Sequence, residues 1–207
     1  MRTVIIRYSP RGIFRRIQYL LLLCAVSLLG YCGFVVADGW MYQNRERSEF
    51  EQQLQNREAG EALRAVSLDA PKRPVPAAAD ALIGRIEIAR LGLSAMVSEG
   101  TGRATLRRAV GHITGMALPG EPGNVGIAGH RDTFFRPLRN IQTDDVITLT
   151  TLSGQYRYRV IFTKVVLPGD VAVLDNTATD SLTLITCYPF YFVGSAPERF
   201  VVRAEKI

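Results

Sequence analysis

The sequence predicts an all-β domain, either an antiparallel sandwich or a closed barrel, preceded by a transmembrane helix and a helical stalk. Residues 17–37 form an uncharged apolar run, IQYLLLLCAVSLLGYCGFVVA. From Leu82 to Ile207, short segments of alternating apolar residues are separated by turn residues, a pattern typical of strands. Many short strands with little helix, in a chain of 207 residues, indicate one main β domain.

The excess of basic residues lies at the N-terminus. Residues 1–16 hold five arginines and no acidic residue, whereas the chain from residue 38 onward has 20 basic and 19 acidic residues. A nearly neutral body lacks the positive surface that nucleic-acid binding requires. We therefore expect no nucleic-acid partner.

The apolar run of residues 17–37 predicts a membrane anchor. About 20 apolar residues cross the hydrocarbon core as a helix, whereas the apolar region of a signal peptide is roughly half as long. The arginines of residues 1–16 place that tail in the cytoplasm, so the rest of the chain is expected in the extracellular or periplasmic space. A cleaved signal peptide is the alternative, although the run is long and lacks a clear small-x-small cleavage site.

Residues 38–81 connect the predicted anchor to the β domain of residues 82–207. The segment Trp40–Val66 is polar and free of proline, which predicts a helical stalk with only a weak apolar stripe. The segment Asp69–Ala81 has three prolines among alanines, which predicts a semi-rigid spacer. We expect the two segments to hold the β domain away from the membrane.

The elements of the β domain follow from apolar alternation and turn residues. The pattern predicts two strands in 82–100, a short helix in 101–110, a strand in 124–130, a helical turn in 132–141, a hairpin in 145–168, and final strands in 181–187 and 199–207. The hairpin is expected to turn at Ser153-Gly154.

Cys187 is a candidate nucleophile. It ends the segment Thr183–Cys187, TLITC, whose residues favour a strand that Pro189 cannot continue. The other two cysteines, Cys24 and Cys32, lie in the apolar run, so Cys187 is the only cysteine expected outside the membrane. A strand end holds a thiol firmly and keeps it reachable, as nucleophilic attack requires. A buried cysteine that acts as a small hydrophobe is the alternative.

His130 is the candidate general acid and base. It follows the apolar strand of GIAGH, and histidine both takes and gives protons near neutral pH. The alternative is a solvated loop histidine. The chain has one other histidine, His112, which we place on a loop before PGEPGN and regard as the less favoured candidate.

Arg199 is a candidate for charge stabilisation beside the thiol. It opens the last strand, 12 residues after Cys187, and the intervening loop is long enough to return an adjacent antiparallel strand. A guanidinium there lowers the pKa of a thiol or donates hydrogen bonds to an oxyanion. Arg203, four residues later, lies on the same face of the strand by alternation. The alternative for either arginine is an ordinary exposed residue of the strand.

These residues together resemble the sortase family. TLITC, an upstream AGH and a downstream RFVV occur in the family's order, and the resemblance spans roughly Leu82 to Ile207. The segment HITGMALPGEPGNVGIAGHRDTFFRPL is similar to the one that leads into the sortase histidine. The long loop CYPFYFVGSAP most resembles class D members, with class E next.

The resemblance implies a closed, antiparallel or mixed β-barrel of about eight strands with short helices, acting as a membrane-anchored cysteine transpeptidase at the bacterial surface. It places the nucleophile on Cys187, the general acid and base on His130, and the oxyanion or substrate-positioning arginine on Arg199. Sortases cleave a sorting signal similar to Leu-Pro-x-Thr-Gly after the Thr and transfer the acyl group to an amine. The implied partners are surface proteins with a C-terminal sorting signal, an amine acceptor such as a cell-wall peptide, and the membrane.

Several neighbouring residues are candidates for binding the substrate, although each is equally compatible with plain core. They are Thr186, Ile185, Ala128, Phe192 and Val193.

Two further expectations concern acidic residues. Asp132 either orients the imidazole of His130 or caps the following turn, and we favour the cap. The acidic residues that bind calcium in some class A sortases have no clear counterpart, so we expect no metal and no cofactor.

Other functions remain open on the sequence alone. A membrane-tethered cysteine hydrolase would use the same site with water as the acceptor. A non-catalytic anchored β-domain for adhesion or assembly would need no reactive thiol. Peptidoglycan L,D-transpeptidases also pair Cys with His and Arg, but their Ser-His-Gly-Cys type of signature is absent around Cys187.

Overall fold

The structure is a computed structural model that describes residues 10–64, 81–177, 179–192 and 194–207. Its contacts divide the chain into two units, Met1–Met41 and Tyr42–Ile207. Most of the predicted basic tail, residues 1–16, and nearly all of the predicted spacer, Asp69–Ala81, lie outside the described residues. The predicted domain boundaries stay predictions.

Helix α1 spans Pro10–Arg64 without a break. Within the first unit its large apolar side chains, from Phe14 to Met41, are exposed on all sides of the helix. By length and composition, its stretch Phe14–Arg57 is the one helical segment among the described residues that is long and apolar enough to cross a membrane. A helix that is apolar all round needs an apolar environment.

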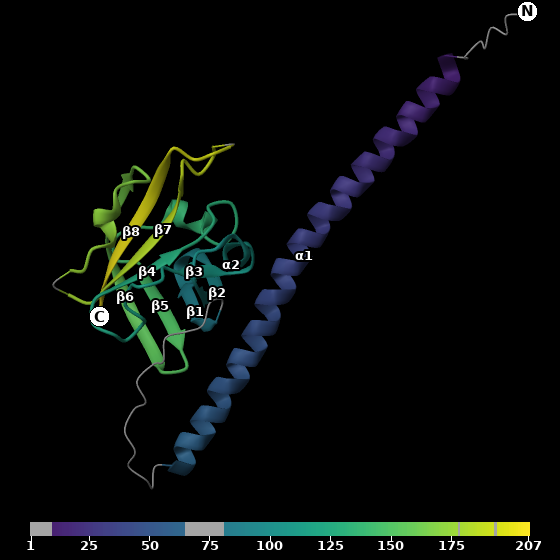
Figure 1. Ribbon diagram of the computed structural model, residues 1–207. Coiled ribbons are helices and arrows are strands. Elements are labelled where there is room, and N and C mark those ends of the chain that lie inside the picture. The colour runs from purple at the N-terminus through teal and green to yellow at the C-terminus, as the bar shows by residue number, and fades with distance from the viewer. Residues whose placement is uncertain (1–9, 65–80, 178, 193) are drawn as a thin grey trace, which may run out of the picture. The chain divides into compact units, whose positions relative to one another are not determined.

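Eight strands of the second unit close into a barrel (Figure 1). They are β1 Leu82–Ile88, β2 Leu93–Glu99, β3 Val110–His112, β4 Asn124–Ala128, β5 Val146–Thr151, β6 Gly154–Val166, β7 Ser181–Tyr188 and β8 Glu198–Lys206. The order around the barrel is β1-β2-β3-β4-β7-β8-β6-β5. The expected closed barrel is confirmed. It is mixed, because the β2/β3 and β4/β7 pairs are parallel and the others antiparallel.

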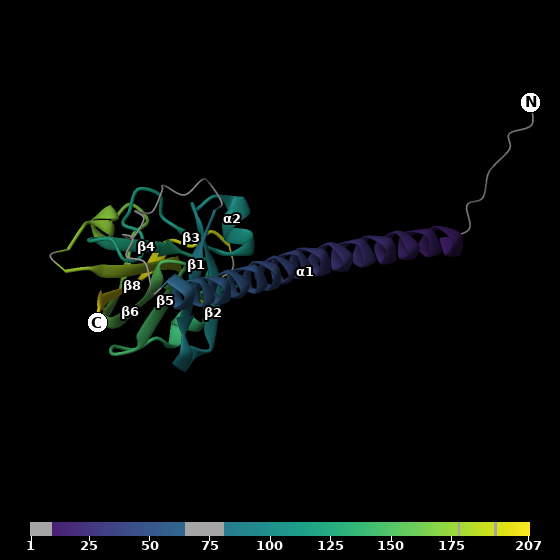
Figure 2. The ribbon, with the colours of Figure 1, turned by 90° about the horizontal axis from the view of Figure 1, so that it is seen from below.

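Short helices connect some of these strands. They are α2 Arg103–Arg108 and the 3-10 helices η1 Ala89–Leu91, η2 Arg136–Asn140 and η3 Val171–Leu174. In Figures 1 and 2, α2 lies beside β3. Gly92, with φ of 62°, ends η1 in the left-handed region that favours glycine and leads into β2.

The barrel interior is filled by alternate residues of the strands. In β5, for example, buried and half-buried positions alternate strictly, as the apolar pattern of the sequence predicts. The buried apolar residues on the strands include Ile86, Ile88, Leu93, Val97, Val110, Val125, Ile127, Ile147, Leu149, Tyr158, Val160, Leu182, Leu184 and Val202. Burial raises the pKa of Tyr158 to about 12.

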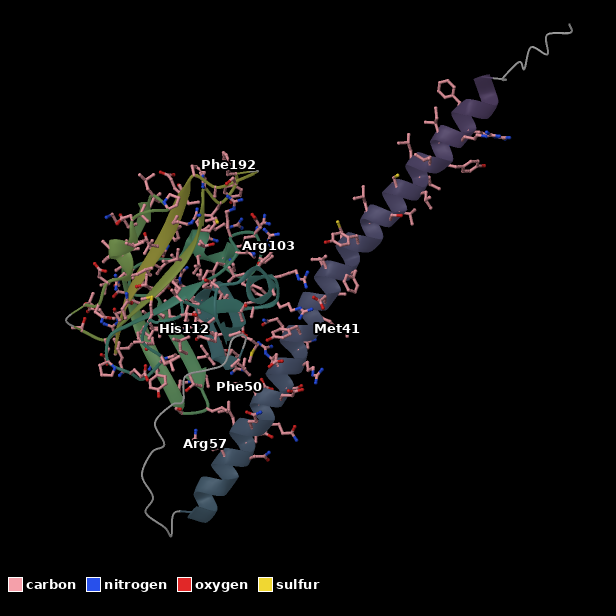
Figure 3. The ribbon with its side chains drawn as sticks, viewed as in Figure 1. Met41, Phe50, Arg57, Arg103, His112 and Phe192 are labelled. Carbon is pink, nitrogen blue, oxygen red and sulfur yellow. The ribbon has the colours of Figure 1, made fainter. Side chains whose placement is uncertain are left out.

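The sequence analysis missed strand β3 and was wrong to place His112 on a loop. His112 is the last residue of β3 and is buried (Figure 3). Its Nδ1 lies 2.7 Å from Oε2 of Glu99, and its Nε2 lies 3.0 Å from the carbonyl oxygen of Ala117. Both ring nitrogens are engaged inside the protein, so His112 has a structural place in the barrel.

The C-terminal part of α1, within the second unit, packs on β1 and β2. Gln43 accepts a hydrogen bond from the backbone N–H of Met96 at 2.9 Å and donates one to the carbonyl oxygen of Arg108 at 2.6 Å. Because β3 pairs only with Val97–Glu99 of β2, the Gln43 amide substitutes for a missing strand partner at Met96. Phe50, labelled in Figure 3, is 1% exposed.

This packing differs from the expected stalk with little apolar surface. Arg47 Nη2 donates to Ser94 Oγ at 2.5 Å, and Arg85 Nη1 donates to Glu51 Oε1 at 3.0 Å, so polar contacts flank Phe50. The weak periodicity of the sequence hid this contact because one aromatic side chain and several polar ones make it.

An ion pair joins η1, which follows β1, to the turn that precedes β5. The guanidinium of Arg90 donates to the carboxylate of Asp145 and, at 2.7 Å, to the carbonyl oxygen of Asn140. The carboxylate also accepts the backbone N–H of Gln142 at 2.8 Å. The hydrogen bond from Arg90, aided by that from Gln142, lowers the pKa of Asp145 below its ordinary value against the opposing effect of burial.

Truncation of Phe50 is expected to destabilise the barrel. Phe50→Ala should lower the free energy of unfolding by about 3 to 5 kcal/mol, because it removes a fully buried aromatic side chain. Calorimetry of the full chain in detergent micelles measures this change. Gln52→Ala, at an exposed position of the same helix, is the control. Equal melting of the two variants would show that α1 contributes nothing to the stability of the barrel.

The Asp145 ion pair predicts a pH-dependent loss of stability. Because the pKa of Asp145 is lowered in the folded state, its contribution is present above the ordinary carboxyl pKa of about 3.9 and disappears as pH falls through the folded value. Arg90→Gln should therefore lower the melting temperature at pH 7, and the difference from wild type should shrink below about pH 4. Arg159→Gln, at an exposed position of β6, is the control, and a difference that stays constant with pH would contradict the assignment.

Candidate active site

Strand β7 carries Cys187 and has β4 on one side and β8 on the other. Cys187 is the next-to-last residue of β7, is half-buried and is a free thiol. The strand runs one residue further than the sequence predicted, to Tyr188. The sheet thus fixes the main chain at Cys187 while leaving its side chain partly accessible.

The parallel register of β4 and β7 brings His130 to the level of Cys187. Ala128 is the register partner of Ile185. His130 follows the last residue of β4 by two places, and Cys187 follows Ile185 by two places on β7. His130 is exposed, as a group that exchanges protons with a substrate must be.

The residue between Ala128 and His130 is tied to β7 by two hydrogen bonds. The N–H of Gly129 donates to the carbonyl oxygen of Ile185 at 3.1 Å, and the hydroxyl of Thr186 donates to the carbonyl oxygen of Gly129 at 2.8 Å. Only glycine fits here, because a Cβ would lie 2.7 Å from the ring of Phe135. These contacts fix the main chain that leads into His130.

Arg199 lies directly opposite Cys187 across the antiparallel β7/β8 pair. Its side chain is half-buried, and its Nη1 donates to the carbonyl oxygens of Ala196 at 3.3 Å and Glu198 at 2.9 Å. The guanidinium therefore lies against the main chain of the loop between β7 and β8. It borders the strand end that carries the thiol.

Arg203 is not the alternative partner of Cys187. It pairs with Thr183, four residues back along β7, and its side chain is buried rather than exposed. It donates to Ser181 Oγ at 3.1 Å and to the carbonyl oxygen of Val173 at 2.6 Å, and burial lowers its pKa. The sequence did not distinguish Arg199 from Arg203. In the structure they pair with different residues of β7, and Arg203 is buried whereas Arg199 is half-buried.

Cys187 of β7 lies opposite Arg199 of β8. On the other side of β7, His130 follows the end of β4 by two residues. Within the described part of the chain, no hydrogen bond joins their side chains. A thiol flanked by an imidazole and a guanidinium has the groups for nucleophilic attack on a carbonyl, proton transfer and stabilisation of an oxyanion. Such contacts often tighten only when a substrate is bound.

The residues predicted to bind substrate differ in accessibility. Ala128 and Ile185 are half-buried register partners just below the candidate site, whereas Thr186 is 2% exposed and bonded to Gly129. The burial of Thr186 favours a positioning role. Phe192 is 43% exposed in the loop between β7 and β8 (Figure 3).

Substrate binding by these residues stays a prediction. Val193, a further residue considered for the groove, lies outside the described residues.

Asp132 does not cap the following turn as expected. Its carboxylate accepts hydrogen bonds from the guanidinium of Arg131, at 3.2 and 3.3 Å, and the residue before η2, Phe135, has no side-chain capping bond. Sequence reasoning missed Arg131, because a basic residue in a polar turn is normally exposed. The adjacent opposite charge of Asp132 was the only signal available.

Among residues 10–64, 81–177, 179–192 and 194–207, no group of three or more His, Cys, Asp or Glu side chains is arranged to hold a metal ion. The absence of a metal and of a cofactor stays a prediction.

Comparison with known proteins identifies relatives of the barrel. A family model described as the sortase domain matches residues 86–207. Sortase D of Bacillus subtilis is 32% identical over 125 residues, which cover 60% of this chain and 63% of that protein. Sortase A of Listeria monocytogenes is 35% identical over 112 residues, which cover 52% and 50%. The chain thus spans less than two thirds of the length of these relatives.

Solved structures agree with these matches. A sortase D5 transpeptidase of Clostridium perfringens superposes with a TM-score of 0.63 at 26% identity and covers 81% of this chain and 99% of that one. Sortase A of Listeria monocytogenes gives a TM-score of 0.57 at 31% identity and covers 62% and 88%. The family model matches more than half of this chain, over a segment that includes Cys187, His130 and Arg199, and the chain therefore belongs to the sortase family.

Proposed function

We propose that the protein is a membrane-anchored cysteine transpeptidase that cleaves a sorting signal similar to Leu-Pro-x-Thr-Gly after its Thr and transfers the acyl group to an amine. The observation that carries this proposal is the place of Cys187 on β7, opposite Arg199 of β8 and beside β4, whose end leads into His130 two residues later. The transpeptidase relative from Clostridium perfringens supports the class of reaction.

In the first half-reaction, the thiolate of Cys187 attacks the Thr carbonyl carbon and forms a carbon–sulfur bond. Arg199 leaves the loop carbonyls and donates hydrogen bonds to the oxyanion. His130, protonated, gives its proton to the leaving nitrogen, because an amide nitrogen leaves poorly without one. The amide bond breaks, and a thioacyl-enzyme and a free amine result.

In the second half-reaction, an acceptor amine attacks the thioester carbonyl. Its proton passes to His130, the carbon–sulfur bond breaks, and the thiolate of Cys187 is restored. With water as the acceptor, the same steps would give hydrolysis. The sequence and the site contain no group that distinguishes the two acceptors, so the products decide between them.

The anchor supplies the location. The exposed apolar side chains of α1 between Phe14 and Met41 suit a lipid environment, and arginines precede them in the sequence. We propose a single span with a cytoplasmic N-terminus and the barrel outside, where its partners are surface proteins and cell-wall amines. Protease added to spheroplasts or protoplasts, whose outer envelope has been removed, should digest the barrel, and protection of the barrel until the plasma membrane is lysed would contradict this orientation.

Incubation with Leu-Pro-x-Thr-Gly peptides should load the full chain, in detergent micelles, with the acyl group up to Thr. Mass spectrometry of the intact protein measures this adduct. Mass spectrometry of the peptide products, formed with and without a glycine-based amine, measures the transfer. Cys187→Ala should form no adduct, since it lacks the sulfur that makes the thioester. A Cys187→Ala protein that still cleaves the peptide would exclude Cys187 as the nucleophile.

The same assay measures the contribution of Arg199. Arg199→Ala should slow turnover by about 100- to 1000-fold, the typical cost of losing an oxyanion donor, without loss of the fold. Arg157→Ala, at an exposed position of β6, is the matched control. An Arg199→Ala protein with the turnover of that control would contradict the role assigned to Arg199.

A further inference from the structure

Arg131, the residue after His130, is buried in a turn whose neighbours are exposed. It is 6% exposed, whereas His130 and Asp132 on either side of it are exposed. A buried charge is tolerated only where it is paired and hydrogen-bonded. The burial of Arg131 therefore requires partners for its guanidinium inside the protein.

The guanidinium of Arg131 joins the His130 segment to the Cys187 segment. Its Nη1 donates to the carbonyl oxygen of Pro189 at 2.7 Å, and its Nε and Nη2 donate to the carboxylate of Asp132 at 3.2 and 3.3 Å. The bonds to Asp132 pair its charge. The bond to Pro189 reaches the residue two places after Cys187.

With this bond, the His130 segment is hydrogen-bonded to the Cys187 segment on both sides of the candidate site. On the near side of Cys187, Gly129 is bonded to Ile185 and Thr186. On the far side, Arg131 is bonded to Pro189. The residues on both sides of His130 are thus tied to residues on both sides of Cys187.

We propose that Arg131 is a positioning residue that sets the distance between the imidazole of His130 and the thiol of Cys187. The inference rests on the proposed transpeptidase function. Among the described residues, the His130 ring has no hydrogen-bond partner, so the main chain on either side of it determines where the ring lies. Arg131 itself does not act on the substrate.

The chemistry makes this distance critical. His130 must deliver a proton to the nitrogen that leaves the carbon attacked by Cys187, so both groups must reach the same peptide bond. A misplacement of about 1 Å costs about 100-fold in rate. A bond on the Gly129 side alone would leave the imidazole at the start of an exposed turn, free to move away from the thiol.

The test compares Arg131→Met and Arg131→Lys with wild type, as full chains in detergent micelles, below the melting temperature of each. Arg131→Met should lower kcat by about 10- to 100-fold with KM changed by less than about threefold, because alignment and not binding is lost. Arg131→Lys should recover part of kcat, since an ammonium still reaches the Pro189 carbonyl but lacks the fork that fits Asp132.

Two matched variants isolate the bond to Pro189. Asp132→Asn keeps Arg131 and should retain most of kcat, and a loss as large as that of Arg131→Met would overturn the proposal in favour of Asp132. Arg136→Met removes an exposed arginine in the same segment and should leave both constants unchanged. A loss of kcat in Arg136→Met as large as that in Arg131→Met would attribute the effect to charge and overturn the proposal.

Each remaining outcome of the test also supports or overturns the positioning role of Arg131. Folded Arg131→Met with the kcat of wild type overturns the proposal, as does a change in KM alone. If Arg131→Met does not fold, Arg131→Gln, which is too short to keep both sets of contacts, takes its place: a lowered kcat at unchanged KM supports the positioning role, and the kcat of wild type overturns it. Wild type that forms no thioacyl-enzyme with any sorting peptide would instead overturn the proposed function, and this inference with it.

Discussion

The parallel pairing of β4 and β7 is the contact on which the candidate site depends. It joins two segments that lie more than 50 residues apart in the chain and fixes their register at Ala128 and Ile185. A shift of one residue would turn the inward-facing side chains of one strand outward, so the apolar core itself specifies the register. The same core that stabilises the barrel therefore sets the level of His130 against Cys187.

Sequence reasoning found the parts of the site because each part has a local signal. Cys187 follows a run of residues that favour a strand, His130 follows another, and Arg199 opens the last strand after a loop of suitable length. The sequence could not show from local patterns that β4 pairs with β7 in parallel, since strand order depends on contacts far apart in the chain. The resemblance to sortases assigned Cys187, His130 and Arg199 to one site, and the strand order came only with the structure.

What was missed has a common physical origin. Strand β3 has three residues, too few for a period-two pattern, so His112 looked like a loop residue. The packing of α1 on β2 relies on Gln43 and Phe50, and one amide with one aromatic ring gives no periodicity. Arg131 and Arg203 are buried by partners on other elements. Burial of a polar residue is a property of the fold and leaves little trace in a single sequence.

Arginines perform related tasks on both loops that flank β7. Arg203 holds the carbonyl of Val173 in η3, which precedes β7, and Arg131 holds the carbonyl of Pro189 in the loop after β7. Main-chain carbonyls outside the strands lack ladder partners, and a guanidinium supplies several donors in a fixed plane. Arg199 also donates to loop carbonyls, but it is half-buried and lies opposite the thiol. The same interaction therefore anchors a connecting segment where the arginine is buried and leaves a donor opposite Cys187 where it is half-buried.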